Sequence, residues 1–263
     1  MKVFITGASS GIGKALATEY AKRHGNKETI IGLVARRSEH LHELQTTLES
    51  TYKVKCTIYP LDVRDSAALA SAADHFMQQF GAPDIVIANA GVSRGTLTEH
   101  AEDIAAFQTI MDINVMGLVH TFQPFIGAMR IAGHGQLVGI ASVAGVRGLP
   151  GAGAYSASKA AAISYLESLR VEMARDNIAV TTIAPGYIRT PMTDVNQYKM
   201  PFLMDADVFA HQFANAVESK RRFCVIPWQM GWVARLLRLI PPFLWDFAMK
   251  KAPHKKRLDW DWL

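Results

Sequence analysis

Short runs of apolar residues, many of them β-branched, alternate along the chain with segments of helical periodicity. The runs at 84–88 and 178–183 are almost continuously apolar, which is typical of parallel strands buried on both faces. We predict strands near residues 2–6, 29–34, 54–59, 84–88, 135–141, 178–184 and 222–226. Helical patterns lie near 11–24, 38–50, 66–79, 100–131 (long enough for two helices), 153–175 and 205–219.

This alternation predicts an α/β fold: a doubly wound, seven-stranded parallel sheet with helices on both faces. We expect one domain, residues 1–226, followed by a C-terminal helical tail, residues 227–263. Ligands of such sheets bind beyond the carboxyl ends of the strands. The residues that follow each strand are therefore the candidates for a site.

The first predicted strand leads into a glycine-rich turn, residues 6–13, that opens a helix. Its glycines allow a tight turn and let the backbone approach a pyrophosphate, whose charge the helix N-terminus binds. A plain structural turn can have the same composition. The order of strand, turn and helix nevertheless favours dinucleotide binding.

The second predicted strand ends in Ala35, Arg36 and Arg37. A site selective for NAD places an acidic residue near this point to bind the ribose 2′-hydroxyl. Two guanidinium groups instead suit the 2′-phosphate of NADP. The alternative is a solvated basic start of a helix, although such a pair opposes the helix dipole unless an anion is bound.

Polar or turn-forming residues also follow the third, fourth and sixth predicted strands. Asp62 and Val63 follow the third strand, where a carboxylate can accept a hydrogen bond from adenine. Asn89, Ala90 and Gly91 form a turn after the fourth. A stiff turn, residues 185–191, follows the sixth and can close over a nicotinamide.

The fifth predicted strand ends at Ser142, and Tyr155 and Lys159 follow on the next helix. Residues four apart lie on one helical face, so the ammonium can act on the phenol. A tyrosine has a pKa of about 10 and is a poor base at neutral pH, but a nearby cation lowers that value. We therefore expect Tyr155 to exchange a proton with a substrate oxygen that Ser142 orients.

Together these residues resemble the roughly 250-residue branch of the short-chain dehydrogenase/reductase family, a family of oxidoreductases with a Rossmann-type sheet. The resemblance covers about residues 2–226. It is carried by Thr6-Gly7-x3-Gly11-x-Gly13, Asn89-Ala90-Gly91, Asn114, Ser142, Tyr155-x3-Lys159 and Pro185-Gly186-x3-Thr190.

The resemblance implies a catalytic set of Asn114, Ser142, Tyr155 and Lys159 and no metal. Tyr155 is then the general acid in ketone reduction and the base in alcohol oxidation, and Ser142 and Tyr155 contact the substrate. Asn114 completes a water-linked proton relay, although its place inside a helical pattern alone favours a structural role. The implied cofactor-binding residues are Gly7, Ser9, Ser10, Gly11, Ile12, Gly13, Arg36, Arg37, Asp62, Val63, Asn89, Ala90, Gly91, Tyr155, Lys159, Pro185, Gly186, Ile188 and Thr190.

The sequence departs from the family pattern at Ala88, where many relatives have a second Asn, and in the tail. Many relatives end soon after the seventh strand with a segment that helps to form tetramers, so the tetramer is in doubt here. The Ala-rich helix at 153–175, with Ala154, Ala157 and Ala161, still allows the family's homodimer.

The C-terminal segment differs from the rest of the chain in its charge and its tryptophan content. Residues 220–263 hold 10 Lys and Arg against 3 Asp and Glu, a charge of +7, and the rest of the chain carries −2, which together give the net +5. All five tryptophans lie in this segment: Trp228, Trp232, Trp245, Trp260 and Trp262. No nucleic-acid motif accompanies the basic residues, so we expect no nucleic-acid partner.

Within the tail, Trp232, Val233, Leu236, Leu237 and Ile240 are predicted to share a helical face, with Arg235 and Arg238 opposite. The charges and the Pro241-Pro242 pair exclude a membrane span. Two alternatives remain open. The tail is an interfacial helix pair at a membrane surface, or it packs on the body or on a second subunit and covers the substrate cleft.

We therefore expect an NADP(H)-dependent enzyme that interconverts a ketone or aldehyde with an alcohol, on an apolar substrate. The apolar residues Met192, Met200, Phe202, Leu203 and Met204 in the expected substrate loop suggest the last point. The alternative is a catalytically idle NADP-binding sensor or scaffold protein. Two cysteines are too few for a disulfide framework, and the N-terminus has no signal-peptide pattern, so we predict a cytoplasmic protein. If the tail is an interfacial helix pair, the protein is peripheral on the inner face of a membrane.

Overall fold

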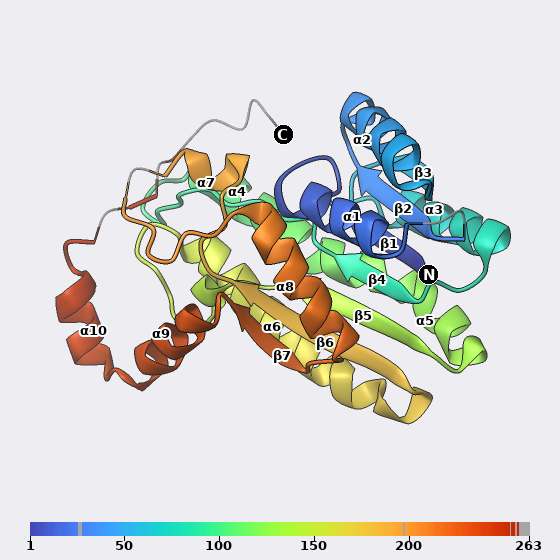
Figure 1. The fold of residues 1–263 in the computed structure, drawn as a ribbon. Helices are drawn as coiled ribbons and strands as arrows, with labels where there is room; N and C mark the ends of the chain where they lie inside the picture. Colours follow the sequence, from blue (N-terminus) through green and yellow to red (C-terminus); the bar gives the residue numbers. More distant parts are fainter. Residues whose placement is uncertain (26–27, 197, 253, 256, 258–263) are drawn as a thin grey trace.

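A seven-stranded parallel sheet forms the centre of the protein, in the order β3-β2-β1-β4-β5-β6-β7 (Figure 1). The computed structural model describes residues 1–25, 28–196, 198–252, 254–255 and 257. The strands are β1 (Lys2–Thr6), β2 (Ile30–Ala35), β3 (Lys55–Pro60), β4 (Ile85–Ala88), β5 (Gly135–Ile140), β6 (Ile178–Pro185) and β7 (Phe223–Ile226). The chain reverses its direction of winding between β1 and β4, so the predicted doubly wound topology is confirmed.

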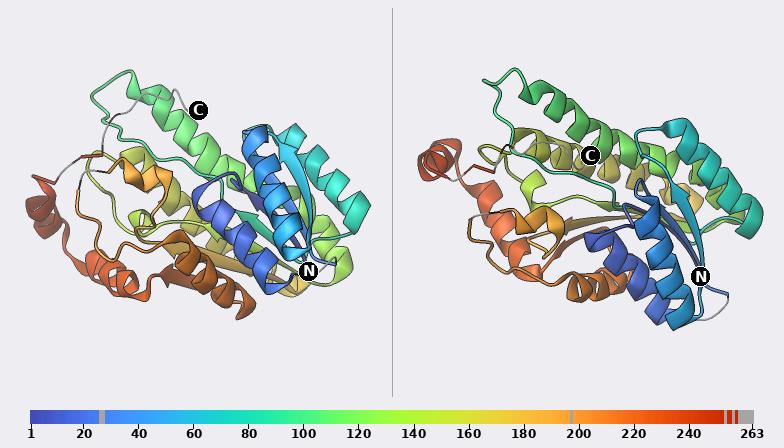
Figure 2. Two further views of the ribbon diagram at one scale, coloured as in Figure 1. Left: turned by 45° about the horizontal axis from the view of Figure 1, so that its top comes forward. Right: turned by 90° about the horizontal axis from the view of Figure 1, so that it is seen from above.

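Helices cover both faces of the sheet, as Figure 2 shows. One face carries α1 (Gly11–Arg23), α2 (Ser38–Tyr52) and α8 (Ala206–Glu218), and the other carries α3 (Ser66–Phe80), α5 (Gly117–Ala132) and α6 (Gly153–Glu172). A further helix, α4 (Asp103–Met111), packs beside α6.

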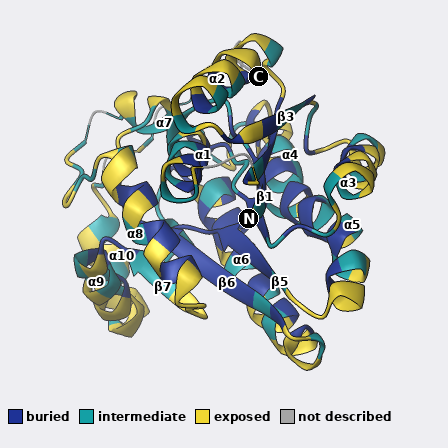
Figure 3. Cartoon of the chain, turned by 45° about the vertical axis from the view of Figure 1, so that its right-hand side comes forward, coloured by how far each residue is buried: buried dark blue, intermediate teal, exposed yellow. Residues whose placement is uncertain are grey.

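Successive residues of each strand point into opposite layers of the core. In β1, Val3 and Ile5 pack against α1, whereas Phe4 packs against Phe76 of α3 and Phe125 of α5. All three β1 residues are fully buried, and Figure 3 shows the sheet enclosed by helices with exposed outer surfaces. Burial on both faces explains why the strands are continuously apolar in the sequence.

The segment predicted as two helices, 100–131, contains a π-helical turn, Asp112–Met116, between α4 and α5. Such turns inside helices often occur at functional sites. The turn contains the buried Asn114, whose side chain bonds to backbone outside the helix. The other predicted elements agree with the structure to within three residues at each end.

The tail forms two helices, α9 (Trp228–Leu239) and α10 (Pro242–Met249), which meet at the predicted proline pair. Met230 and Ala234 of α9 are buried against the body, and Val233, which belongs to the predicted apolar face, is partly buried beside them. Trp232 and Leu236 of that face are exposed. The predicted face therefore packs on the body only at its edge. No helix in the described part of the chain is long and apolar enough to span a bilayer.

Arg147 attaches the tail helices to the body. Its Nη1 donates hydrogen bonds to the carbonyl oxygens of Leu237, at 3.0 Å, and Ile240, at 2.8 Å. Its guanidinium also lies 4.9 Å from the ring centroid of Trp245 in α10. Since the last carbonyls of a helix lack internal partners, Arg147 caps α9 and holds α10 with one side chain.

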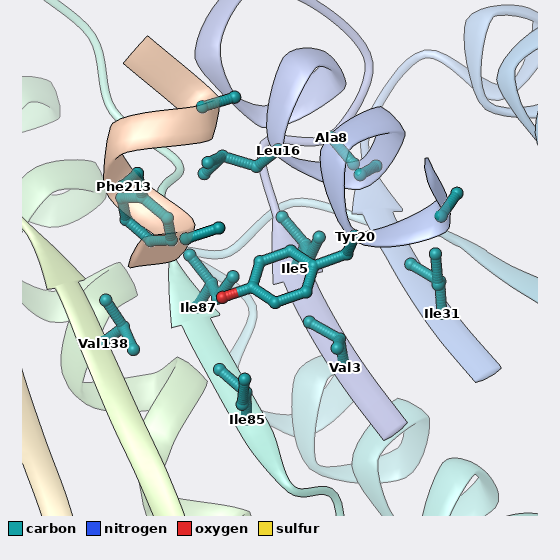
Figure 4. Packing of buried hydrophobic residues seen from close by; sticks show 14 of the residues in the cluster. Val3, Ile5, Ala8, Leu16, Tyr20, Ile31, Ile85, Ile87, Val138 and Phe213 are labelled. Carbon is teal, nitrogen blue, oxygen red and sulfur yellow. The ribbon is translucent and has the colours of Figure 1, made fainter. Parts of the chain in front are cut away.

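A buried tyrosine in the core gives a stability prediction. The hydroxyl of Tyr20 is buried, lies near Val3, Ile5 and Ile85 (Figure 4), and has no hydrogen-bond partner among the described residues. An unpaired buried hydroxyl costs about 1–3 kcal/mol, so we expect Tyr20→Phe to raise the free energy of unfolding by about 1 kcal/mol. Urea denaturation measures the change.

Tyr59 provides the matched control, because its hydroxyl is hydrogen-bonded to Nδ1 of His75 at 3.0 Å. Tyr59→Phe is expected to lower the free energy of unfolding by about 0.5–1.5 kcal/mol. Equal effects of the two substitutions would contradict the claim that the Tyr20 hydroxyl is unpaired.

Candidate active site

The turn from β1 to α1 brings backbone groups to the edge of the sheet. Gly7 and Gly11 have φ values of +70° and +51°, which favour glycine. A Cβ atom at Gly13 would collide with the carbonyl oxygen of Gly7, so the helix can approach the strand only because residue 13 lacks a side chain. Asn89 Nδ2 donates to the carbonyl oxygens of Thr6, at 2.9 Å, and Gly7, at 3.2 Å, and fixes the turn.

The two arginines after β2 lie at the same edge. Arg37 Nη2 donates to Ser10 Oγ at 3.0 Å and to Ser9 Oγ at 3.2 Å, across the glycine-rich turn. Arg37 also precedes α2 as its N-cap residue, so a positive charge stands at the positive end of that helix. Arg36 Nη1 lies 3.9 Å from Asp62 Oδ2.

Asp62 and Val63 follow β3, as predicted. The carboxylate of Asp62 accepts hydrogen bonds from the guanidinium of Arg64, the shortest at 2.7 Å. Burial raises the pKa of Asp62, but the bonds from Arg64 outweigh it and hold the pKa below its usual value. Val63 is buried, and its Cγ2 leaves no space for a side chain at Gly117.

Ser142, Tyr155 and Lys159 come together at the carboxyl ends of β5 and β6. Ser142 Oγ accepts a hydrogen bond from the backbone of Ala144 at 3.1 Å, and Ser142 lies close enough to the Tyr155 side chain to influence its pKa. Lys159 is 4% exposed; its Nζ donates to the carbonyl oxygen of Ile140 at 2.9 Å and lies 5.9 Å from the Tyr155 ring centroid. The hydroxyls and the ammonium therefore line one wall.

The electrostatics of Tyr155 differ from the expectation that Lys159 lowers its pKa. Burial raises the pKa of Tyr155, and the hydrogen bond to Ser142 only partly opposes this. Burial also lowers the pKa of Lys159, to about 8. The ammonium is directed at the Ile140 carbonyl, so in this structure desolvation of the phenol dominates.

Asn114 lies next to Lys159 but is fully engaged as a donor. Its Nδ2 donates to Val92 O and Ser158 Oγ, both at 2.9 Å, and its Oδ1 accepts from Val92 N at 2.8 Å. A Cβ at Gly91 would lie 3.2 Å from Asn114 Oδ1 and 3.4 Å from Lys159 Nζ, so the amide and the ammonium face the same glycine. Only the oxygen of Asn114 has capacity for a further hydrogen bond.

The turn after β6 packs against the glycine-rich turn. Ile188 is buried, and Thr190 caps the short helix α7 (Pro191–Asp194) through its side chain. A Cβ at Gly11 would lie 3.2 Å from the methyl group of Thr190, and a Cβ at Gly186 would lie 2.8 Å from Met230 Cγ in the tail. The turn therefore joins the glycine-rich turn, the sheet and the tail.

One cavity of about 550 Å³ connects these groups. Of the residues predicted for the site, all line this cavity except Gly13 and Asn114, which lie behind its wall. Four polar lining residues were not predicted: Ser93, Arg94, Thr193 and Lys255. Ser93 and Arg94 lie two and three residues after the Asn89–Gly91 turn, and Thr193 lies three residues after the predicted Thr190, which are usable signals. Nothing in the sequence places Lys255 here.

Comparisons with known proteins agree with this geometry. The family model described as short chain dehydrogenase matches residues 1–200. An uncharacterized oxidoreductase of Myxococcus xanthus is 32% identical over 249 residues, which cover 94% of this chain and 95% of that protein.

Solved structures show the same fold. A short-chain dehydrogenase from Sphingobium yanoikuyae in complex with NADPH is 25% identical, with a TM-score of 0.76, covering 92% of this chain and 96% of its own. L-Sorbose reductase from Gluconobacter frateurii, complexed with NADPH and L-sorbose, is 28% identical, with a TM-score of 0.73 and coverages of 82% and 88%. A Mycobacterium paratuberculosis enzyme bound to NAD is 23% identical, with a TM-score of 0.74 and coverages of 85% and 94%. This chain therefore belongs to the short-chain dehydrogenase family of oxidoreductases.

Proposed function

We propose that the protein is an NADP(H)-dependent oxidoreductase that interconverts a ketone or aldehyde with an alcohol, with Tyr155 as general acid and base. The observation that carries this proposal is that Ser142, Tyr155 and Lys159 line one cavity, which is continuous with the glycine-rich turn. Both hydroxyls can bind one substrate oxygen, and Tyr155 can exchange a proton with it.

The residues of the cavity fit a dinucleotide. Gly7 and Gly11 line the cavity beside the N-terminus of α1, and Gly13 lets that helix approach the strand closely. This combination suits a pyrophosphate. When bound, the nicotinamide cofactor donates or accepts a hydride.

Side chains of the protein itself supply the proton that the reaction needs. Because burial raises its pKa, Tyr155 holds its proton at neutral pH and is ready to donate it to a carbonyl oxygen that Ser142 orients. Lys159 holds a positive charge at the cavity wall, where it stabilises negative charge that develops on the phenol. We assign Asn114 a positioning role beside Lys159, in which its free Oδ1 lone pair can bind the water of the predicted relay.

We infer a preference for NADP(H) over NAD(H) from the end of β2. Ala35 occupies the position of the acidic residue that NAD selectivity requires, and Arg36 and Arg37 line the cavity. Arg37 and two serine hydroxyls form a set of donors suited to a phosphate. The family fold alone does not select the cofactor, since its members include complexes with NAD and with NADPH.

We infer a largely apolar substrate from the cavity wall beyond Tyr155, to which Val92, Met192 and Val195 contribute. Of the remaining loop residues, Met204 packs on the core, so its apolar character has a structural reason. Phe202 is exposed.

A screen of NADPH oxidation tests the proposed function. Ketones, 3-oxoacyl esters and steroids are offered with NADPH, and with NADH as the control. We expect turnover of at least one apolar carbonyl compound with NADPH and slower turnover with NADH. NADPH binding without oxidation in any reaction would favour the idle sensor or scaffold protein.

We further propose that the tail binds the surface of an anionic lipid bilayer. The exposed apolar residues of α9 and α10 are Trp228, Trp232, Leu236, Leu239, Phe243, Leu244 and Phe247. Arg235, Arg238, Lys250 and Lys251 are exposed on the same two helices and the residues just after them. Aromatic side chains next to basic ones match the headgroup region of an anionic membrane, and in Figure 1 both helices lie at one end of the molecule.

Co-sedimentation with vesicles tests this surface. We expect binding to phosphatidylglycerol-containing vesicles that weakens with salt, and about a tenfold lower bound fraction for the double variant Trp232→Ser, Leu236→Ser. Ile131, which is 91% exposed on α5, provides the matched control Ile131→Ser. If the double variant sediments with the vesicles like the wild type, the surface does not bind the bilayer. If the double variant instead lowers the molecular mass measured by light scattering, the surface is a contact between subunits.

We propose a cytoplasmic homodimer. Both cysteines are free thiols, which fits a reducing compartment.

For the dimer, Ile104 and Phe107 of α4 are 68% and 42% exposed, which supports a contact beside α6. Ala157 is exposed there, but Ala154 is buried within the protomer and does not belong to the predicted Ala-rich face. Light scattering measures the oligomeric state.

A further inference from the structure

The last described residues return from α10 to the cavity. Arg257 Nε donates to Asp103 Oδ2 at 2.8 Å, and its Nη2 donates to Glu102 Oε1 at 2.7 Å, at the start of α4. Asp103 is 3% exposed, and its Oδ2 also accepts from the backbone of Leu97 at 2.8 Å. His254 packs on Gly151, before α6. The segment is therefore held at the start of α4 and just before α6.

Between these two contacts, Lys255 lines the same cavity as Ser142 and Tyr155. Its Nζ donates to Ser93 Oγ at 2.8 Å. Among the described residues no carboxylate forms an ion pair with it, and the carboxylates of Glu102 and Asp103 pair with Arg257 instead. Burial lowers the pKa of Lys255 to about 8, so the side chain is mostly charged at neutral pH.

An ammonium with one neutral acceptor is incompletely compensated. It has three N–H donors, of which Ser93 uses one. Withdrawing a charge from water without a counter-ion is unfavourable, and an anion inside the cavity would offset that cost. Arg94 lines the cavity next to Ser93 and adds positive charge at the same end.

We propose that Lys255 binds an anionic oxygen group of the substrate, a carboxylate or a phosphate, while the reacting carbonyl lies at Ser142 and Tyr155. This inference rests on the proposed carbonyl chemistry and deepens it by naming a substrate class: an apolar compound with an anionic end. The segment that holds Lys255 then contributes to the choice of substrate.

Calorimetric binding to the full-length, NADPH-saturated protein tests the proposal without requiring turnover. The probes are decanoate, decyl phosphate and the uncharged decanol, each below its micellar concentration. We expect the wild type to bind one of the two anions roughly tenfold or more tightly than decanol. Lys255→Met should remove that advantage and leave decanol binding unchanged, and the anion that binds more tightly identifies the group.

Lys199, an exposed lysine that does not line the cavity, provides the control Lys199→Met, which should bind all three probes like the wild type. Lys255→Arg should retain part of the advantage, since it keeps the charge. The proposal is overturned if the wild type binds neither anion better than decanol, or if Lys255→Met keeps the wild-type preference. A failure of Tyr155 as proton donor would show in turnover only, so the two failures are distinguishable.

Discussion

Tyr155→Phe is expected to lower kcat for carbonyl reduction by about 10³-fold while the Kd for NADPH stays within about twofold. The substitution removes only the hydroxyl, which lies in the same cavity as Ser142 and is the group proposed to donate the proton. The ring, the ammonium of Lys159 and the glycine-rich turn remain in place. Stopped-flow measurement of NADPH oxidation and fluorescence titration of NADPH give the two quantities.

Tyr165 offers a matched control, because it is a half-buried tyrosine on the same helix outside the cavity. Tyr165→Phe should keep kcat within about twofold. Retained turnover in Tyr155→Phe would remove Tyr155 from the proposed chemistry.

The pH dependence of reduction gives an independent check. A folded-state pKa above its usual value of about 10 means that Tyr155 keeps its proton throughout the neutral range. The reduction rate should therefore stay level up to about pH 7, fall in part near pH 8 as Lys159 loses its proton, and be lost only in strongly alkaline solution. Complete loss of the rate with one proton well below pH 7 would contradict burial as the dominant influence on this phenol.

The fold was predictable because the apolar runs and the glycine-rich turn in the sequence indicate the same architecture. Continuous apolar runs predict strands buried on both faces, and the chain meets this by placing Phe4 in one layer of the core and Val3 and Ile5 in the other. The glycines at 7, 11 and 13 were informative because close backbone approach is possible only without a side chain.

What the sequence could not predict depends on contacts between distant segments. Periodicity grouped Trp232 and Leu236 on one apolar face of α9 but could not predict which side of the helix packs on the body. The residues that pack there are the small Ala234 and the flexible Met230, beside Val143. The position of Lys255 beside Ser93 depends on the anchoring of Arg257 at α4, and no local pattern encodes a contact across that sequence distance.

For Tyr155, the spacing to Lys159 correctly brought the two side chains to one cavity wall. The direction of the pKa shift was predicted wrongly, because it depends on how deeply the phenol is buried and on which acceptor the ammonium finds. Neither burial nor the Ile140 carbonyl can be deduced from spacing.

The double variant Arg36→Gln, Arg37→Gln is expected to raise the KM for NADPH by about 100-fold and to change the KM for NADH by less than threefold. Each charged hydrogen bond to a phosphate contributes about 1.5–3 kcal/mol, and only NADPH carries the 2′-phosphate. Arg37 already lies across the glycine-rich turn through Ser9 and Ser10, so its guanidinium needs no large rearrangement to reach an anion there. Steady-state kinetics with both cofactors measure the effect.

Arg64 is the control, because it lies at the same edge and binds Asp62 but does not line the cavity. Arg64→Gln should affect the two cofactors equally, since Asp62 is proposed to meet the adenine that both share. Adding Ala35→Asp to the double variant should lower the KM for NADH, because a carboxylate at the end of β2 can accept from a ribose 2′-hydroxyl. If the double variant weakens NADPH and NADH alike, the two arginines serve the fold of the β2–α2 junction, and the selectivity for NADP(H) must come from another part of the cavity.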